Sequence, residues 1–178
     1  MDGTDRHLRH LQRMRVRALV SSIVTAAGLG VGLVACNRGP SPLPLPGTLR
    51  AHLNAERFGP VTSSYGLPMG VRDALQELFG GPSLDIADPG AEFEGTGAAA
   101  GAGLPTRRLV AAGCSIDHCL VYYERGGSAH TWRVALFHWT PAETRFEWGG
   151  AAPGGLQALE DVRRAVASGK ITSPDKAW

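Results

Sequence analysis

The residues best suited to chemistry lie in one short segment in the second half of the chain, where Cys114 and Cys119 enclose the tetrapeptide Ser115-Ile116-Asp117-His118. Strand-like sequence flanks this segment on both sides, so a four-residue turn would place the two cysteines opposite each other. Facing Cβ atoms in an antiparallel pair lie about 4.5–5.5 Å apart, close to the roughly 3.5–4.5 Å of a disulfide. The spacing therefore predicts a Cys114–Cys119 disulfide.

Three other chemistries use the same residue types. A zinc site from Cys114, Cys119, His118 and Asp117 would lack the second ligand pair of structural zinc sites. A redox role would need C-x-x-C, whereas the spacing is C-x₄-C. A hydrolytic triad from Ser115, Asp117 and His118 would have to align three neighbours of one turn, and no G-x-S-x-G surrounds the serine. The structural disulfide is favoured, and no motif names a catalytic reaction.

Imidazole and aromatic side chains near the hairpin suggest a binding surface, with cross-strand packing as the simpler interpretation. The candidates are His118, Tyr122, Tyr123, His130 and Trp132. His130 and His138 fall on one face of a predicted strand, but at 3.3 Å per residue they lie about 26 Å apart. They are expected to be separate strand-end residues that share no ligand.

A glycine-rich stretch, 80–103, is expected to form a long loop that carries the acids Asp85, Asp88, Glu92 and Glu94. Carboxylates on a flexible loop suit calcium, although the spacing does not match an EF-hand. A solvated acidic loop is the favoured interpretation, and calcium is the alternative.

The N-terminal segment has the pattern of a targeting signal. Five arginines between Arg6 and Arg17 precede the charge-free run Ala18–Ala35, which ends in Leu33-Val34-Ala35-Cys36. This ending resembles the lipobox of bacterial lipoprotein signal peptides, and the resemblance covers the first fifth of the chain. An uncleaved signal anchor is the alternative, and either segment would export the rest of the chain.

The resemblance implies that Cys36 receives a diacylglycerol, that the chain is cut before it, and that an N-acyl chain caps the new amine. Two or three acyl chains would hold the protein on a membrane. In a Gram-negative host, Asn37 rather than Asp after the cysteine favours the periplasmic face of the outer membrane. The remaining domain resembles small envelope lipoproteins in architecture alone, which implies no catalytic residue and no cofactor beyond the lipid.

Composition excludes a nucleic-acid binder. The 178 residues hold 18 Lys+Arg and 16 Asp+Glu, but residues 1–35 account for five of the arginines and two of the aspartates. The mature part thus carries 13 basic and 14 acidic side chains, a formal charge of −1. It lacks the concentrated basic face that phosphate binding needs.

Three regions follow: a signal peptide (1–35), a lipidated cysteine with a proline-rich linker (36–48), and a single domain (49–178). Four prolines in RGPSPLPLPG predict an extended spacer that reaches about 30 Å.

Within the domain, helical periodicity marks 49–58, 71–79 and 156–168. Alternating β-branched and aromatic residues mark four strands, 107–114, 119–125, 130–140 and 145–148. In the third strand both faces carry apolar residues, so helices should cover each side. We predict an α+β fold in which a four-stranded antiparallel meander packs with two or three helices.

These features favour a lipid-anchored, non-catalytic envelope protein that binds another envelope protein or a cell-wall component. One alternative is a small envelope hydrolase with His118 or His130 as base and Glu124 or Asp117 as helper. The other is a thiol-disulfide helper that uses Cys114 and Cys119.

Overall fold

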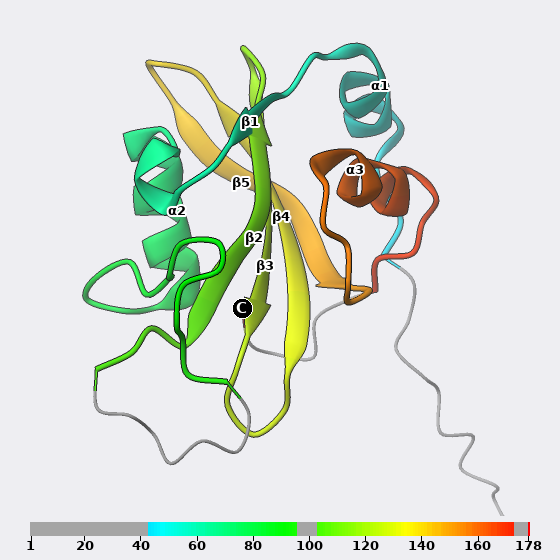
Figure 1. Ribbon diagram of the computed structural model, residues 1–178. Helices are drawn as coiled ribbons and strands as arrows, with labels where there is room; N and C mark the ends of the chain where they lie inside the picture. Colours follow the sequence, from blue (N-terminus) through cyan, green and yellow to red (C-terminus); the bar gives the residue numbers. More distant parts are fainter. Residues whose placement is uncertain (1–42, 96–102, 173–177) are drawn as a thin grey trace, which may run out of the picture. The chain divides into compact units, whose positions relative to one another are not determined.

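The computed structural model describes residues 43–95, 103–172 and 178 (Figure 1). The predicted signal peptide, Cys36 and the first part of the linker lie outside the described residues. Within the described ranges, no helix combines the length and apolarity needed to cross a bilayer.

The fold is built on an antiparallel sheet whose spatial order follows the chain, β1-β2-β3-β4-β5. The strands are β1 (Gly59–Val61), β2 (Arg107–Cys114), β3 (His118–Arg125), β4 (Thr131–Trp139) and β5 (Thr144–Ala152). The predicted α+β class and antiparallel meander are confirmed. The predicted strand number is wrong, because the sheet has five strands rather than four.

The additional strand, β1, pairs with β2 through Gly59↔Cys114, Pro60↔Gly113 and Val61↔Ala112. It was missed because three residues are too few for an alternation signal and because proline disfavours a strand. Pro60 is tolerated since β1 lies at the sheet edge, where a missing N–H costs little. The strand extends the sheet on the side of β2.

The last strand, β5, runs four residues beyond the predicted 145–148, through two glycines that look like a turn in the sequence. A Cβ on Gly149 would lie 2.3 Å from the carbonyl oxygen of Val134 in β4, and one on Gly150 would lie 2.3 Å from that of Thr172. Glycine is therefore required here by close backbone approach rather than by a turn.

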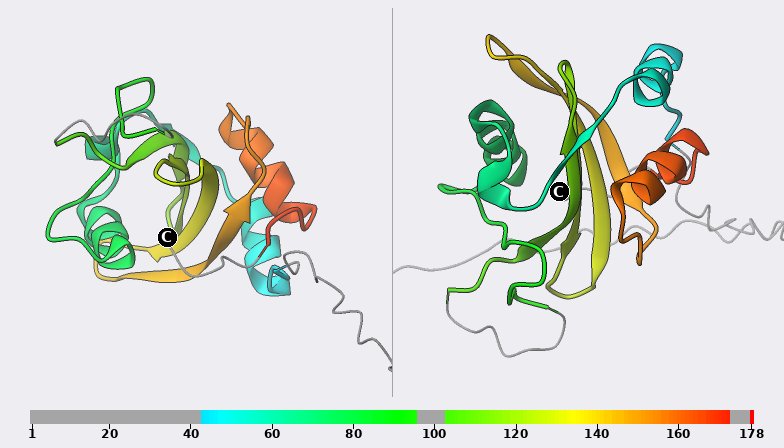
Figure 2. Two further views of the ribbon diagram at one scale, coloured as in Figure 1. Left: turned by 90° about the horizontal axis from the view of Figure 1, so that it is seen from below. Right: turned by 45° about the horizontal axis from the view of Figure 1, so that its top comes forward.

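Among the described residues, three α-helices form near their predicted positions: α1 (Gly47–Ala55), α2 (Met69–Phe79) and α3 (Leu159–Ala167). A short 3₁₀ helix, Ser64–Gly66, precedes α2. The predicted stop of the second helix is confirmed, because Gly80 adopts a left-handed conformation (φ 68°) and its N–H bonds to the carbonyls of Gln76 and Glu77. Figures 1 and 2 show α2 on one face of the sheet and α1 with α3 on the other.

Each face of the sheet carries a hydrophobic core, as the apolar character of both faces of the third predicted strand indicated. Along β3, Leu120 and Tyr122 point to the core under α1 and α3, whereas Val121 and Tyr123 point to the core under α2. All four are fully buried. The sheet is thus a central layer with helices on both sides.

The last part of the predicted linker packs against the domain. The backbone N–H of Leu43 donates to the carbonyl of Ile171 (2.9 Å), and the indole N–H of Trp148 donates to that of Pro44 (3.2 Å). Leu45 is buried in the core under α1 and α3. Residues 43–46 therefore belong to the folded part of the chain.

Candidate functional site

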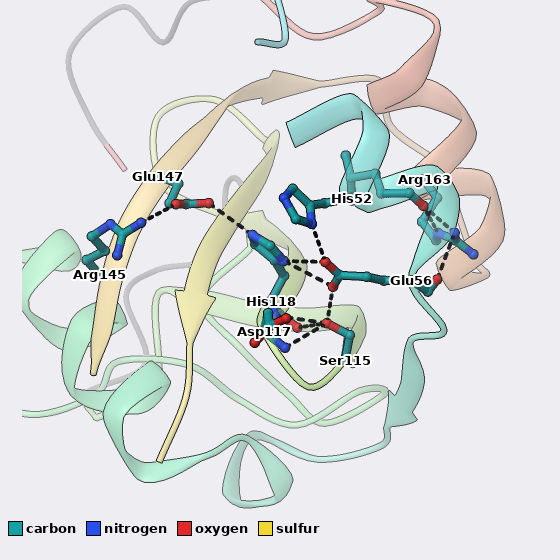
Figure 3. Close-up of polar contacts among 9 residues, drawn as sticks. His52, Glu56, Ser115, Asp117, His118, Arg145, Glu147 and Arg163 are labelled. Carbon is teal, nitrogen blue, oxygen red and sulfur yellow. Dashed lines mark hydrogen bonds and ion pairs between the residues drawn. The ribbon is translucent and has the colours of Figure 1, made fainter. Parts of the chain in front are cut away.

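A polar cluster surrounds His118, the first residue of β3, whose side chain is 5% exposed. We call it the His118 cluster; it comprises His52, Glu56, Ser115, His118, His138 and Glu147. The first two residues come from the end of α1, the next two from the β2–β3 hairpin, and the last two from β4 and β5. Figure 3 shows the side chains of Glu56 and Glu147 reaching His118 from opposite sides.

Glu56, directly after α1, is the main acceptor of the cluster. Its carboxylate accepts from the Ser115 hydroxyl and lies 2.8 Å from Nδ1 of His118 and 2.7 Å from Nδ1 of His52. Burial raises the pKa of Glu56, but hydrogen bonds from Ser115, His118 and His52 outweigh it, so the pKa is lowered. Arg163 of α3 fixes the end of α1 by donating to the carbonyls of Leu53 and Glu56.

Ser115 organises the hairpin and does not act as a nucleophile paired with histidine. Its hydroxyl oxygen accepts the backbone N–H of His118 (2.9 Å) and that of Asp117 (3.3 Å). A hydrolytic triad requires the serine hydroxyl to bond to the imidazole. Here Ser115 and His118 both bond to Glu56 instead, so the predicted triad alternative is not formed.

Glu147 reaches the cluster through a β-bulge. Leu136 of β4 is opposite Trp148 and Phe137 is opposite Phe146, which leaves Glu147 as the extra residue of β5. A bulge re-aims a side chain, so Glu147 reaches His118 although its neighbour Trp148 packs on the same side of the sheet.

The two carboxylate oxygens of Glu147 have different surroundings. Oε1 accepts from Arg145 (2.7 Å). Oε2 is buried and has no hydrogen-bond partner among the described residues, although it lies 3.3 Å from Nε2 of His118.

His138 completes this side of the cluster. It is directly opposite His118 in the β3–β4 pairing, with ring centroids 5.8 Å apart. Among the described residues, two groups of His, Cys, Asp or Glu are close enough to share an ion. Both contain His118: one adds His52 and Glu56, and the other adds His138 and Glu147.

The sulfur atoms of Cys114 and Cys119 lie at bonding distance, 2.03 Å, across the strand pair in the expected register. With both sulfurs in this bond, neither thiolate is available for the zinc alternative. Cys119 is fully buried, which restricts the access that thiol exchange needs.

A second polar cluster lies at the other end of β3. Glu124 is bound by Arg108 and by Nε2 of His130, each at 2.6 Å, and His130 stacks on Trp132 with a centroid distance of 4.3 Å. The structure thus brings together the predicted pair His130 and Glu124. It gives His118 a different acid partner from the predicted Asp117, namely Glu56.

The two predicted binding-surface tyrosines are core residues. Tyr122 and Tyr123 are fully buried on opposite faces of the sheet, so neither contributes to an exposed surface. Tyr122 donates its hydroxyl to the carbonyl of Pro153 (2.7 Å), and burial raises its pKa to about 12. The other three residues of the predicted binding surface lie at the two polar clusters. His118 belongs to the His118 cluster, and His130 and Trp132 lie at the cluster around Glu124.

Two of the four predicted calcium ligands fasten the loop to the domain. Asp85 accepts from the Thr106 backbone (2.8 Å) and from Arg107 (2.7 Å). Asp88 accepts from the backbone N–H (2.6 Å) and the hydroxyl (2.7 Å) of Ser64, which lower its pKa. The carboxylates of Asp85 and Asp88 are thus occupied by hydrogen-bond donors of the protein. Neither Glu92 nor Glu94 belongs to the ion-sharing groups found among the described residues.

Sequence reasoning did not identify His52, Glu56 and Glu147 as site residues, and it assigned His138 no ligand. A signal existed for one pair, because His52 and Glu56 are four residues apart in a predicted helix and so share a face. No signal existed for Glu147, since regular alternation in β5 would put it on the opposite face from Trp148. The bulge that changes this is a tertiary feature.

Comparison with known proteins finds no matching family model, no matching curated protein and no matching solved structure. Function is therefore inferred from the residues of this chain alone.

Proposed function

We propose that this chain is an exported, lipid-anchored domain of the bacterial cell envelope that acts as a non-catalytic binding module. The observation that carries the proposal is the disulfide that joins Cys114 and Cys119, which face each other across β2 and β3. Structural disulfides persist in oxidising compartments outside the cytosol, which agrees with export. The pairing also leaves Cys36 as the third and unpaired cysteine, at the position where the lipobox resemblance expects the lipid.

The short distance along the chain between Cys36 and the domain supports a role close to the membrane. The first described residue, Leu43, already bonds to Ile171 of the domain, and seven Cα–Cα steps separate it from Cys36. At no more than 3.6 Å per step, this stretch spans at most about 25 Å. A partner of the module would therefore lie at the membrane surface or in the adjacent wall layer.

Helices cover both faces of the sheet, so the partner would bind at the loops and strand ends rather than on an open sheet. The large apolar side chains exposed outside the sheet include Ile116, at 79%, in the β2–β3 hairpin, and Tyr65, at 82%, in the short 3₁₀ helix Ser64–Gly66. Aromatic residues are enriched in protein interfaces, so Tyr65 is a candidate contact for the partner.

The intact mass of the full chain, extracted from membranes with detergent, tests the proposal. We expect the mass of residues 36–178 plus two or three acyl chains, and a gain of two hydrogens on reduction. A Cys36→Ser chain should carry no lipid and should leave the membrane fraction if the signal is cut, while its disulfide is unchanged. An unmodified full-length chain with three free thiols would contradict both the anchor and export.

One observation supports the hydrolase alternative, namely the 2.6 Å contact between His130 and Glu124. Glu124 lines a depression of about 420 Å³, together with Arg108 and Trp132. Purified full chain would be assayed on ester, peptide and glycan substrates, with His130→Ala and His118→Ala compared. Activity lost only in His130→Ala would support hydrolysis at this pair, and inactivity of the wild-type chain on every class would count against it.

A further inference from the structure

One ring nitrogen of His118 is held by a carboxylate, which determines what the other can do. Nδ1 lies 2.8 Å and 3.0 Å from the two oxygens of Glu56. A carboxylate at that distance holds a proton on Nδ1, so in the neutral ring the lone pair lies on Nε2. Histidines that bind metal ions in proteins almost always donate their second ring N–H in this way.

Nε2 of His118 faces a second electron-rich atom. Oε2 of Glu147 lies 3.3 Å away, buried and without a hydrogen-bond partner among the described residues. In the neutral ring that lone pair faces a carboxylate oxygen, an unfavourable contact in a buried site unless a cation, either a proton on Nε2 or a metal ion, lies between the two atoms. Arg145 binds Oε1, which leaves Oε2 to be a ligand when a metal ion takes the place of that proton.

We propose that His118, through Nε2, together with His138 and Glu147 binds one divalent transition-metal ion of the zinc type. One ligand atom from each residue lies within 4.8 Å of the others. Ligands at about 2.0–2.2 Å from a tetrahedral ion are about 3.3–3.6 Å apart. Oε2 of Glu147 already lies at this spacing from Nε2 of His118 (3.3 Å), so binding would mainly adjust the position of the His138 ring.

The ligand types select the class of metal. Two imidazoles and one carboxylate are typical of zinc and related first-row ions, whereas calcium and magnesium bind mainly carboxylate, carbonyl and water oxygens. Three protein ligands leave at least one coordination position for water or an external group. The site goes beyond the proposed envelope function and does not depend on the lipid anchor.

The other ion-sharing group is not the metal site. In that group the Glu56 carboxylate is already bound to three donors, from His52, Ser115 and His118. An ion there would have to displace protons from existing hydrogen bonds, and the His52 side chain is 51% exposed. Glu56 is therefore a positioning residue that orients His118 toward the ion.

Zinc titration of the full chain, untagged, in detergent and freed of metal by a chelator, tests the site. We expect one equivalent of Zn²⁺ by calorimetry and, with Co²⁺ in its place, visible absorption bands typical of a low-symmetry site. Glu147→Gln and His138→Gln should each weaken zinc binding at least about 100-fold. Glu56→Gln should weaken it about 10–100-fold and keep the stoichiometry, as loss of an outer-shell partner does.

Two controls make the result specific. His130→Gln removes a histidine that also contacts a glutamate, at the other end of β3, and should leave zinc affinity unchanged. Cys36→Ser should also bind one equivalent, so failure of the lipid proposal would not be mistaken for failure of the metal site. The far-UV circular dichroism of each metal-free variant should match that of the wild-type chain.

Absence of stoichiometric zinc binding by the folded wild-type chain would overturn the proposal. So would equal affinity in the wild-type, Glu147→Gln and His138→Gln chains, because zinc would then bind elsewhere. If Glu147→Gln does not fold, His138→Gln alone tests the site. Loss of zinc affinity and of the Co²⁺ bands in His138→Gln would support the site. Retention of both would contradict it.

Discussion

Single carboxylates join distant segments of this chain. Glu56 connects the end of α1 to the β2–β3 hairpin, and Asp88 connects the loop after α2 to Ser64. In both cases an ionised oxygen accepts more than one donor, and such charge-assisted bonds are stronger than neutral ones. Removing the acceptor leaves the donors unsatisfied, which costs more than the bond itself contributed.

Asp88→Ala should lower the free energy of unfolding by about 1–2 kcal/mol, because the buried Ser64 loses the acceptor of both its backbone N–H and its hydroxyl. Asp88→Asn should cost less, since the amide oxygen can still accept. Urea denaturation at neutral pH measures both changes. Equal stability of the wild-type and Asp88→Ala chains would show that the loop is fastened by other contacts.

The pH dependence of the Asp88 contact has a definite sign. Hydrogen bonds from Ser64 lower the pKa of folded Asp88 below its ordinary 3.8, so its contribution is fully present above that value and is lost as pH falls through the folded pKa. The stability difference between the wild-type and Asp88→Asn chains should therefore be constant from about pH 6 to pH 5 and should shrink at lower pH. Urea midpoints at each pH measure it, and a difference that grows on acidification would contradict the assignment.

At the scale of elements, the sequence predicts whatever depends on local periodicity. The helix around Val71 and Leu75 and the strands flanking the Cys114–Cys119 hairpin are found near their predicted positions. Features that depend on distant chain segments are not predictable in this way. The edge pairing of β1, the continuation of β5 through Gly149, and the bulge at Glu147 all arise from contacts across the sheet. Most of the His118 cluster was missed for the same reason, since its residues come from the end of α1, the β2–β3 hairpin, β4 and β5.

Gly149→Ala should destabilise the protein by about 1–3 kcal/mol, because the added methyl would meet the Val134 carbonyl oxygen at 2.3 Å and the strands would have to separate. Gly47→Ala is the matched control: nothing lies within 4 Å of its added Cβ, and alanine favours the helix that begins there. Thermal unfolding should show a lower Tm for the first variant and an equal or higher Tm for the second. A neutral Gly149→Ala would mean that β5 ends earlier than Ala152.

The β2–β3 hairpin depends on its covalent link. Replacing Cys114 and Cys119 together with serine should lower the free energy of unfolding by about 2 kcal/mol, the value expected when a very short loop loses its cross-link. Urea denaturation of the double variant and of the reduced wild-type chain should agree within about 1 kcal/mol. Cys36→Ser is the control, and its domain should unfold at the wild-type urea concentration. Unchanged stability of the double variant would show that strand pairing alone holds the hairpin.

At the scale of the whole molecule, one sheet serves two cores. Adjacent residues of β3 alternate between them, with Leu120 in one and Val121 in the other, and both are fully buried. If one core loses its packing, one face of the sheet is exposed to water. The strands that the other core packs against are then destabilised as well. The described part of the chain from Leu43 to Thr172 is therefore expected to unfold as one cooperative unit, as small domains generally do.

Leu75→Ala tests this coupling from the α2 side. Leu75 is fully buried in the core under α2, so its truncation should cost about 2–5 kcal/mol. The test uses a chain in which Trp132, Trp139 and Trp178 are replaced by phenylalanine, so that fluorescence reports on Trp148, which is buried in the opposite core. Because the sheet is shared, this fluorescence should change at the same lowered urea concentration as the far-UV circular dichroism. Glu77→Ala, on the exposed side of the same helix, should shift neither signal by more than about 0.5 kcal/mol. Two separate transitions in Leu75→Ala would mean that the cores unfold independently, and the His118 cluster, built on the α1 side of the sheet, would then survive the loss of α2.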